Sequence, residues 1–97
     1  MSLPEVTHLQ FLVLGALKDS ELPGRLLRDV LAEHGARKSL AAFYQLMMRL
    51  EDAGFVAGWY EQQVVDSQLL KERHYKITAA GVAAWQSVVD FYGTVPN

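Results

Sequence analysis

Apolar residues recur along this chain with two different periods, and the change between them divides it into helices and strands. Residues 8–17 are apolar on almost every side of a helix, which is typical of a central buried helix. Thr7 and Gln10 have the spacing of a capping box and predict that this first helix begins there and runs to about Leu17. The polar stretch from Lys18 to Gly24 predicts a turn.

A second helix is predicted from about Pro23 to His34, because four aliphatic residues share one of its faces. They are Leu26, Leu27, Val30 and Leu31. On the outside, Arg25 and Asp29 are four residues apart and are expected to pair. Gly35 supplies the stop, and His34 is placed to interact with the dipole and the last carbonyls of the helix.

A third helix is predicted to begin after Ser39, a good N-cap residue, and to end before Gly54. Four residues recur at helical spacing and are expected to face the core: Leu40, Phe43, Met47 and Leu50. The opposite side receives Ala41, Ala42, Gln45, Met48, Arg49 and Asp52, with Tyr44 on the flank. This outer side carries little charge, and its alanines would let another molecule approach closely. An ordinary amphipathic helix remains the alternative interpretation.

Two strands follow, from Phe55 to Tyr60 and from Arg73 to Ile77, because both runs contain strand-type residues with partial alternation. The segment between them, Gln62–Glu72, is long for a hairpin loop. Its apolar portion, from Val64 to Leu70, could extend the strands, fold back on the body or meet a partner. The sequence leaves these three roles open.

A fourth helix is predicted from Ala79, after a Thr78 cap, to about Tyr92. One apolar stripe consists of Val82, Trp85, Val89 and Tyr92, and its neighbour of Gly81, Ala84, Val88 and Phe91. Together the stripes cover about half the circumference, more than the ~100° that packing on one domain requires. We therefore expect this helix to pack both on its own domain and on a second copy. A broad core helix in a monomer is the alternative.

This order of elements predicts an α+β, mostly helical fold: a winged helix-turn-helix with three helices, a two-stranded β-wing and a C-terminal dimerisation helix. The 97 residues are expected to form a single domain (1–97), with its core in residues 7–77 and its last helix in 78–92. Hydrophobic residues make up 51% of the chain, which suggests apolar surface that a partner covers.

Composition also excludes several classes of protein. The absence of cysteine excludes disulfides, thiol catalysis and cysteine-ligated metals. The apolar stretch Leu9–Leu17 is too short to cross a bilayer, so a cytoplasmic protein with no membrane partner is expected. His8, His34 and His74 lie on different elements without metal-binding spacing, and Glu51 and Asp52 are expected to form surface salt bridges. We therefore expect no enzymatic activity, no metal and no cofactor.

The charge balance works against nucleic-acid binding, which depends largely on neutralising phosphates. The chain has 9 basic and 11 acidic residues, giving a net charge of −2. Residues 37–76 hold six of the basic side chains (Arg37, Lys38, Arg49, Lys71, Arg73 and Lys76) and five acidic ones (Glu51, Asp52, Glu61, Asp66 and Glu72). The half of the chain that contains the third helix and the hairpin is therefore about neutral.

At specific residues the sequence resembles the PadR-like winged-helix transcriptional regulators, over about residues 7–92. The resemblance rests on Leu12-Val-Leu-Gly-Ala-Leu, on Phe43-Tyr44 followed by Leu46 and Arg49-Leu50-Glu51, on Gly54-Phe55-Val56, and on Arg73-His-Tyr-Lys-Ile-Thr78 with Gly81 after it. It departs from the family at Pro23-Gly24-Arg25-Leu26, at Ala42 and at the hairpin tip, Asp66-Ser67-Gln68, where the family commonly has other polar or basic residues.

The resemblance implies a dimeric repressor whose third helix enters the major groove of double-stranded DNA and whose wing contacts the backbone. By motif, Ser39 and Tyr44 would contact phosphate, the outer residues Ala41, Ala42, Gln45 and Arg49 would meet bases, and Lys71 and Arg73 would serve the wing. Gln45 could pair with adenine, and Arg37 and Lys38 precede the helix where phosphates would lie. The homodimer interface would contain Val82, Trp85, Val88, Val89, Phe91 and Tyr92.

Two further interpretations accompany this one. Trp85 could meet its symmetry mate across the dimer axis, where a flat apolar effector could also bind, although plain interface packing is the simpler role. Trp59, on the first strand, is expected in the core or in an interface. As a different class of function, the chain could be a protein–protein interaction module that keeps the winged-helix body and has lost most of its DNA binding.

Overall fold

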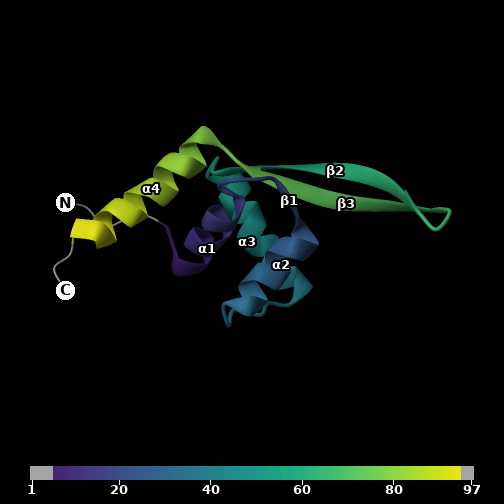
Figure 1. Cartoon of the computed structure of the whole chain (residues 1–97), viewed down its shortest axis with the longest axis horizontal. Helices are drawn as coiled ribbons and strands as arrows, with labels where there is room; N and C mark the ends of the chain where they lie inside the picture. The colour runs from purple at the N-terminus through teal and green to yellow at the C-terminus, as the bar shows by residue number, and fades with distance from the viewer. Residues whose placement is uncertain (1–5, 95–97) are drawn as a thin grey trace.

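A computed structural model describes residues 6–94, and Figure 1 shows their arrangement. The elements follow the order α1 (His8–Leu17), β1 (Leu22–Pro23), α2 (Gly24–Glu33), α3 (Leu40–Asp52), β2 (Val56–Val65), β3 (Gln68–Ile77) and α4 (Ala79–Thr94). The first three helices form a body. The β2–β3 hairpin projects from one end of this body, and α4 extends toward the other end.

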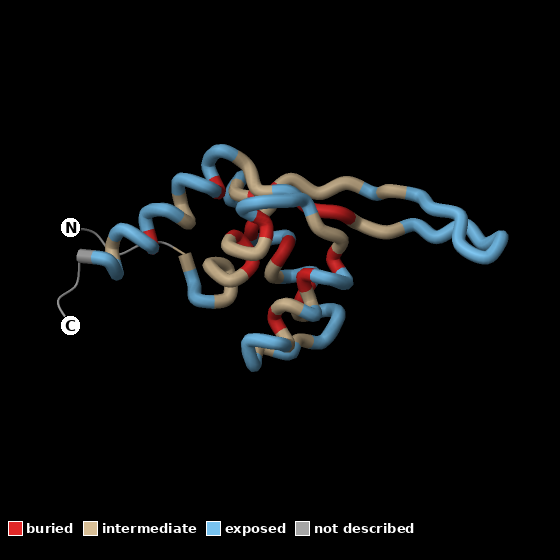
Figure 2. The backbone as a smooth tube through the Cα atoms, in the orientation of Figure 1, coloured by how far each residue is buried: buried red, intermediate tan, exposed pale blue. Residues whose placement is uncertain are grey.

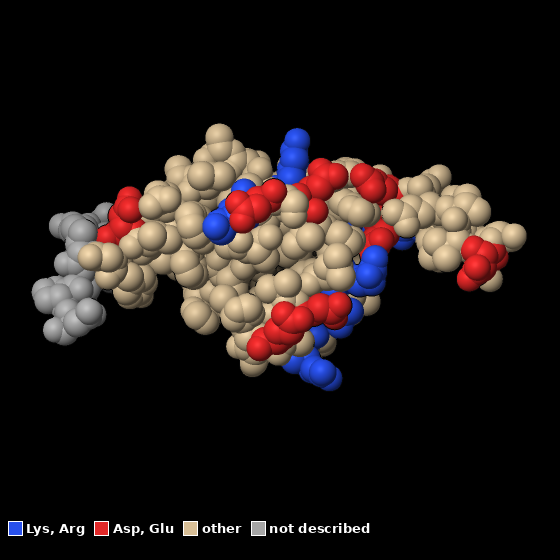
Figure 3. Space-filling view, viewed as in Figure 1, with Lys and Arg blue, Asp and Glu red and all other residues tan. Residues whose placement is uncertain are grey.

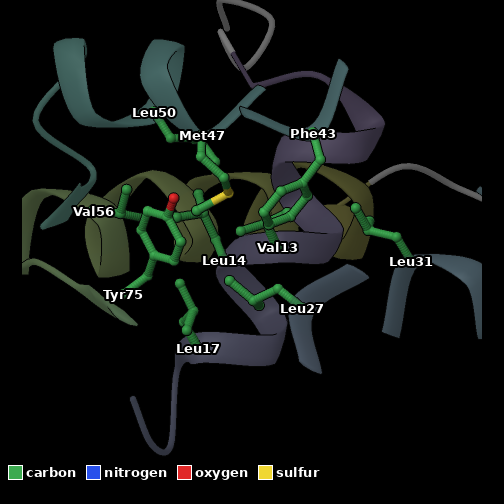
Figure 4. Close-up of a cluster of buried hydrophobic side chains, with 10 residues drawn as sticks. All are labelled: Val13, Leu14, Leu17, Leu27, Leu31, Phe43, Met47, Leu50, Val56 and Tyr75. Carbon is green, nitrogen blue, oxygen red and sulfur yellow. The ribbon is translucent and has the colours of Figure 1, made fainter. Parts of the chain in front are cut away.

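The core lies inside the helical body, as the red segments of Figure 2 show. Its buried side chains are Val13, Leu14, Leu17, Leu27, Leu31, Phe43, Met47, Leu50, Val56 and Tyr75 (Figure 4). Among them, the Phe43 and Tyr75 rings pack edge to face, with centroids 6.4 Å apart. Aromatic pairs prefer this geometry. It joins α3 to β3 at the base of the hairpin.

The predicted helix ends are confirmed. Thr7 and Gln10 form a capping box, since the Gln10 amide donates to Thr7 Oγ1 (3.2 Å) and the Thr7 amide donates to Gln10 Oε1 (3.0 Å). Ser39 Oγ accepts the Ala42 amide at 3.2 Å and caps α3. Gly35 and Gly54, with φ of 77° and 79°, end α2 and α3 in the left-handed conformation.

His34 has the role that the sequence predicts for it. Its Nδ1 lies 2.9 Å from the carbonyl oxygen of Val30, one of the last carbonyls of α2. The Val30 carbonyl also accepts the His34 backbone amide at 3.2 Å, so the ring nitrogen is a second polar neighbour of this carbonyl at the C-terminal end of α2.

Two side chains predicted to face the core are exposed instead. Leu26 is 37% exposed and Leu40 is 49% exposed. Each lies in the first turn of its helix, at the margin of the body, where helical periodicity continues although no neighbouring element covers the side chain. The Arg25 guanidinium also differs from the prediction. It pairs with Glu72, with Nε 2.9 Å from Oε1, because α2 begins beside β3.

The sheet has three strands in the order β1-β3-β2, so the prediction of a purely two-stranded unit is incomplete. The polar stretch predicted as a turn contains β1, which pairs Leu22 with Tyr75 and Pro23 with His74. A strand of only two residues is too short to show an alternation of apolar and polar residues in the sequence. Pro23 is tolerated because β1 is an edge strand, where a missing N–H breaks no ladder.

The hairpin is longer than predicted, because both strands continue through the apolar segment. The register runs from Val56 opposite Ile77 to Val65 opposite Gln68. A two-residue turn joins them at Asp66 (φ 51°) and Ser67 (φ 64°). Positive φ at both central residues is the type I′ arrangement, which matches the twist of paired strands. Of the three roles left open for this segment, strand extension is the one observed.

The junction of α3, β2 and α4 depends on a close backbone approach at Gly81. Thr78 Oγ1 donates to the Gly54 carbonyl (2.6 Å) and accepts the Gly81 amide (3.0 Å), so it caps α4 and ties it to the end of α3. A Cβ on Gly81 would collide with the Phe55 carbonyl oxygen and would lie 2.7 Å from Ile77 Cγ1. The start of α4 therefore packs directly on the backbone at Phe55. Backbone atoms cannot move aside as a flexible side chain can.

We predict that Gly81→Ala lowers the free energy of unfolding by about 1–3 kcal/mol, the usual cost of overpacking, although alanine favours helices. Urea denaturation followed by circular dichroism measures the change. Gly93→Ala is the matched control, because Gly93 also lies in α4 and an added Cβ would meet no atom of residues 6–94 within 4 Å. Equal stability of both variants would contradict the close approach at Gly81.

Candidate nucleic-acid interface

The outer face of α3 is exposed over most of its length. Ala41, Gln45 and Arg49 are exposed, and Ala42 is half-buried. Tyr44 and Met48 present large side chains, 47% and 57% exposed. The Ser39 hydroxyl oxygen accepts the Ala42 amide as the helix cap, which leaves its O–H group to donate to a ligand. The face that the sequence assigns to base contact is thus accessible.

A hollow of about 430 Å³ runs along this face, between α3 and the beginning of α1. The residues on one side are Lys38, two residues before α3, and Ala42, Gln45, Leu46 and Arg49 of α3. Those on the other side are the N-cap Thr7 and His8, Leu9 and Gln10 of α1. The structure thus brings together four predicted residues from positions 38–49. It also adds the first turn of α1, which the sequence analysis missed. The sequence feature that could have indicated this surface is the pair of polar residues His8 and Gln10 in an otherwise apolar helix.

A second basic surface surrounds the loop between α2 and α3. The described residues that line its hollow of about 390 Å³ are Arg25, Arg28, Asp29, Ala32, Arg37 and Lys38. Figure 3 shows Lys and Arg side chains gathered along the lower edge of the body, below the hairpin. Arg25 and Arg28 were not among the predicted residues. They precede residues 37–76 in the sequence, and only the fold brings them beside Arg37 and Lys38.

Of the two predicted wing residues, Arg73 is half-buried and makes its contacts within the protein. Its Nη2 lies 2.5 Å from Glu51 Oε1, and its guanidinium lies over the rings of Tyr60 (4.9 Å) and Tyr75 (5.6 Å). Burial by itself lowers the pKa of Arg73, but the hydrogen bond and charge of Glu51 outweigh it and raise the pKa. Burial also raises the pKa of Tyr75 to about 12. Both side chains therefore keep one protonation state at neutral pH.

The space for this ion pair comes from Gly58 on β2. A Cβ there would collide with Glu51 Oε1 and would lie 2.7 Å from Arg73 Nη2. The pair thus connects the end of α3 to β3. It lies beneath β2 at Gly58, where that strand has no side chain. Arg73 positions the hairpin, while Lys71, which is exposed with its Nζ 4.7 Å from the centre of the Tyr60 ring, is free to meet a ligand.

The hairpin tip is apolar and carries an acidic turn. Val64 and Leu69 lie opposite each other and are 74% and 64% exposed. Leu70 and Val65 are 48% and 43% exposed, and Asp66 forms the turn. The tip therefore presents an apolar surface and one negative charge. A wing that binds the phosphate backbone would need cationic side chains at this position.

Trp59 lies on the other face of the hairpin, half-buried, in neither the main core nor a fully exposed surface. Its ring stacks on His74 at 6.1 Å, and its Nε1 donates to Glu61 Oε1 at 3.1 Å. Glu61 Oε2 is in turn 3.2 Å from His74 Nε2. These contacts close the solvent side of the sheet. Within residues 6–94, no group of three or more potential ligands is arranged to hold a metal ion.

On α4, the two apolar stripes separate by burial. Val88 is buried in the chain itself (5% exposed), whereas Val82, Val89 and Tyr92 are 44%, 37% and 69% exposed. Trp85, predicted to meet its mate across a dimer axis, stacks on Phe11 of its own α1, with ring centroids 6.1 Å apart. Phe91 is half-buried and packs edge-on against Tyr92. The surface left for a partner is therefore centred on Val82, Val89 and Tyr92.

A further hollow, of about 300 Å³, lies between α4 and the beginning of α1. Val6, Phe11, Val88 and Tyr92 supply its apolar lining, with Thr7 and His8 at one side. No helix among the described residues is both long and apolar enough to span a bilayer.

Comparison with known proteins identifies similar folds. No protein-family model matches the sequence, and no curated protein matches it. Among solved structures, a PadR family transcriptional regulator from Eggerthella lenta DSM 2243 is 29% identical, with a TM-score of 0.67 over 88% of this chain and 71% of that one. A PadR family transcription regulator from Clostridium difficile R20291 is 13% identical, with a TM-score of 0.76 over 90% of this chain and 88% of that one.

A third similar structure is Bacillus subtilis PadR in complex with operator DNA. It is 20% identical, with a TM-score of 0.65 over 93% of this chain and 49% of that one. The chain is thus PadR-like, as its motifs suggest, and the predicted winged-helix fold is confirmed.

We predict that Glu51→Gln lowers the free energy of unfolding by about 1–3 kcal/mol, because it leaves the Arg73 guanidinium without its counter-charge in a half-buried site. Thermal and urea denaturation measure the change. Asp52→Asn, a charge-matched substitution of the exposed neighbouring residue, should change stability by less than about 0.5 kcal/mol. If both substitutions have the same small effect, the ion pair is not what fixes the hairpin.

Proposed function

From this likeness to PadR-family transcriptional regulators, we propose that the chain is a sequence-specific, DNA-binding transcriptional regulator that acts as a homodimer. In this proposal α3 enters the major groove and the hairpin lies along the flanking backbone. The observation that carries the proposal is the exposed face of α3, with Gln45 and Arg49 on it and Arg37 and Lys38 at its N-terminal end.

The charges on this surface suit the backbone of a duplex. Arg37 and Lys38 precede the cap of α3, where the helix dipole is also positive. Such residues supply most of the affinity of a DNA-binding protein but little of its sequence preference. Gln45 and Arg49 are the candidates for base contacts, since their side chains match the edges of adenine and guanine in the major groove.

The homodimer is proposed from the exposed stripe on α4. A large apolar stripe on a monomer usually marks an interface, and a twofold axis makes one stripe complementary to itself. Val82, Val89 and Tyr92 would form its centre. The neighbouring hollow at Phe11 and Val88 would then lie close to the subunit interface, where a flat apolar small molecule could act as an effector.

Repression is the proposed mode of regulation, because a dimer bound at a promoter excludes other proteins from the same DNA. The alternative function is a protein–protein interaction module with weak or lost DNA binding. The apolar hairpin tip and its acidic turn favour this alternative, since neither feature suits a phosphate backbone.

We predict that replacing both Arg37 and Lys38 with alanine weakens binding to duplex DNA and lowers the slope of log K against log salt by about 1.8, roughly 0.9 for each lost phosphate contact. Electrophoretic shift or fluorescence anisotropy at several salt concentrations gives the slope. DNA adjacent to the coding region is the first probe.

Lys18→Ala is the control for this experiment, because Lys18 lies at the far end of α1, over the Trp85 ring. Its slope should equal that of the wild type. Absence of wild-type binding to any duplex at low salt would leave the interaction module as the better proposal.

We predict that Val89→Asp converts a dimer of about twice 10.9 kDa into a folded monomer, because a charge would be buried in an apolar interface. Light scattering coupled to size exclusion gives the mass, and circular dichroism checks the fold. Ser87→Asp is the control, since Ser87 is exposed on another side of α4. A wild-type particle of monomer mass at micromolar concentration would end the dimer proposal.

A further inference from the structure

A separate basic pocket lies where the start of α2, the start of α3 and the hairpin meet. Its volume is about 200 Å³, and four cationic side chains line it: Arg25, Arg28, Lys71 and Arg73. Tyr44 and Tyr60 form aromatic walls, and Glu72 is the acidic residue in the lining. These residues come from four elements, α2, α3, β2 and β3, so the pocket exists only in the folded chain.

Two of the four cations already have carboxylate partners. Arg25 pairs with Glu72, and Arg73 pairs with Glu51. Within residues 6–94, neither Arg28 nor Lys71 has a carboxylate oxygen within 4 Å of its side-chain nitrogens. The pocket therefore retains two positive charges that the described part of the chain does not neutralise.

Arg28 is the more informative of the two. Among the described residues its Nε is buried and has no hydrogen-bond partner, and its Nη2 makes a long 3.5 Å bond to the Lys38 carbonyl. Arginine stays protonated in proteins, so it cannot relieve this cost by losing its charge. A buried charged donor without an acceptor is strongly unfavourable. Such a group requires an acceptor from outside the chain, either a water molecule or a bound anion.

The first residues of α2 add to the positive potential. Gly24 and Arg25 line the same pocket, and the preceding residue, Pro23, makes no side-chain cap to the helix. The start of a helix carries partial positive charge and uncapped amide groups. The pocket thus combines a guanidinium group, an ammonium group and the start of a helix. Together these groups can donate hydrogen bonds to a tetrahedral oxyanion and balance its negative charge.

We propose that this pocket is a phosphate-binding site, with Arg28 as its principal ligand and Lys71 as the residue that closes it from the hairpin. A bound phosphate would join β3 to α2 and so hold the hairpin against the body. The same chemistry has two sources: a backbone phosphate of DNA, which rests on the function proposed above, or the phosphate of a free small molecule, which does not.

The first experiment titrates the full-length protein with inorganic phosphate at constant ionic strength, set with chloride, and follows amide shifts by NMR. Saturable shifts at residues 24–28 and at Lys71 are expected in the wild type. Arg28→Met should weaken binding roughly tenfold or more, the effect of losing charge-assisted hydrogen bonds. Lys71→Met should also weaken binding. Lys76→Met is the matched control, because Lys76 lies on the same strand but on its other face.

Stability separates a ligand-binding arginine from a structural one. Methionine keeps the aliphatic stem of Arg28 without its unpaired donor, so Arg28→Met should not lower the melting temperature in phosphate-free buffer. Added phosphate should raise the melting temperature of the wild type more than that of the variant. If Arg28→Met does not fold, Lys71→Met, at an exposed position, decides the question by the same titration.

The second experiment identifies the source of the phosphate. If a DNA phosphate occupies the pocket, Arg28→Met should lower the salt slope of DNA binding by about 0.9, and Lys76→Met should not. If a free phosphorylated molecule occupies it, the slope should stay unchanged while inorganic phosphate still binds. Either result supports the site.

Two results would overturn the site. One is the absence of saturable phosphate shifts in the wild type together with an unchanged salt slope for Arg28→Met. The other is phosphate binding that Arg28→Met and Lys71→Met leave intact. Failure of the wild type to bind any DNA would instead remove the regulator function, and the phosphate titration would still decide whether the pocket binds an oxyanion.

Discussion

The ion pair between Glu51 and Arg73 determines where the hairpin lies relative to α3, and the surface described above depends on that placement. The pair is half-buried beneath Gly58, where any side chain would displace it. Breaking such a pair is costly because one charge would remain desolvated. With Arg73 held at the end of α3, Lys71 lies two residues farther out, beside Tyr60. The position of the wing therefore depends on a charge that pairs within the protein.

The same contacts explain how an acidic chain can present a basic surface. Glu51 and Glu72 lie in the half of the protein that would meet DNA, but each is engaged by an arginine from another element. The basic residues that remain available are Arg28, Arg37, Lys38, Arg49 and Lys71. Interaction with phosphate depends on this local distribution, because charges beyond a Debye length of about 8 Å are screened at physiological salt. The net charge of the chain is therefore a poor guide.

The two apolar stripes of α4 have different roles in the described chain. Gly81, Ala84 and Val88 pack on the domain, with Gly81 set by the Phe55 carbonyl. Trp85 also turns toward the domain and stacks on Phe11, which reduces its share in any contact between subunits. The exposed stripe that remains, Val82, Val89 and Tyr92, is narrower than the sequence suggests. A subunit interface built on it would include Tyr92 and the hollow beside α1.

The helices, their caps and their stops were predictable because they depend on short-range rules: the Thr7–Gln10 box, the Ser39 cap, and left-handed Gly35 and Gly54. The winged-helix order and the outer face of α3 followed from the same periodicity. β1, the full hairpin and the exposure of Leu26 and Leu40 could not be predicted in this way, since each depends on which distant segment lies alongside. The partners of the charged residues were likewise decided only in three dimensions. Arg73, predicted to meet a ligand, pairs with Glu51. Arg28, which no motif identifies, lines a pocket and has no carboxylate partner within residues 6–94. Sequence spacing specifies neighbours within one helix or strand, whereas charge pairing is a property of surfaces that only the fold brings together.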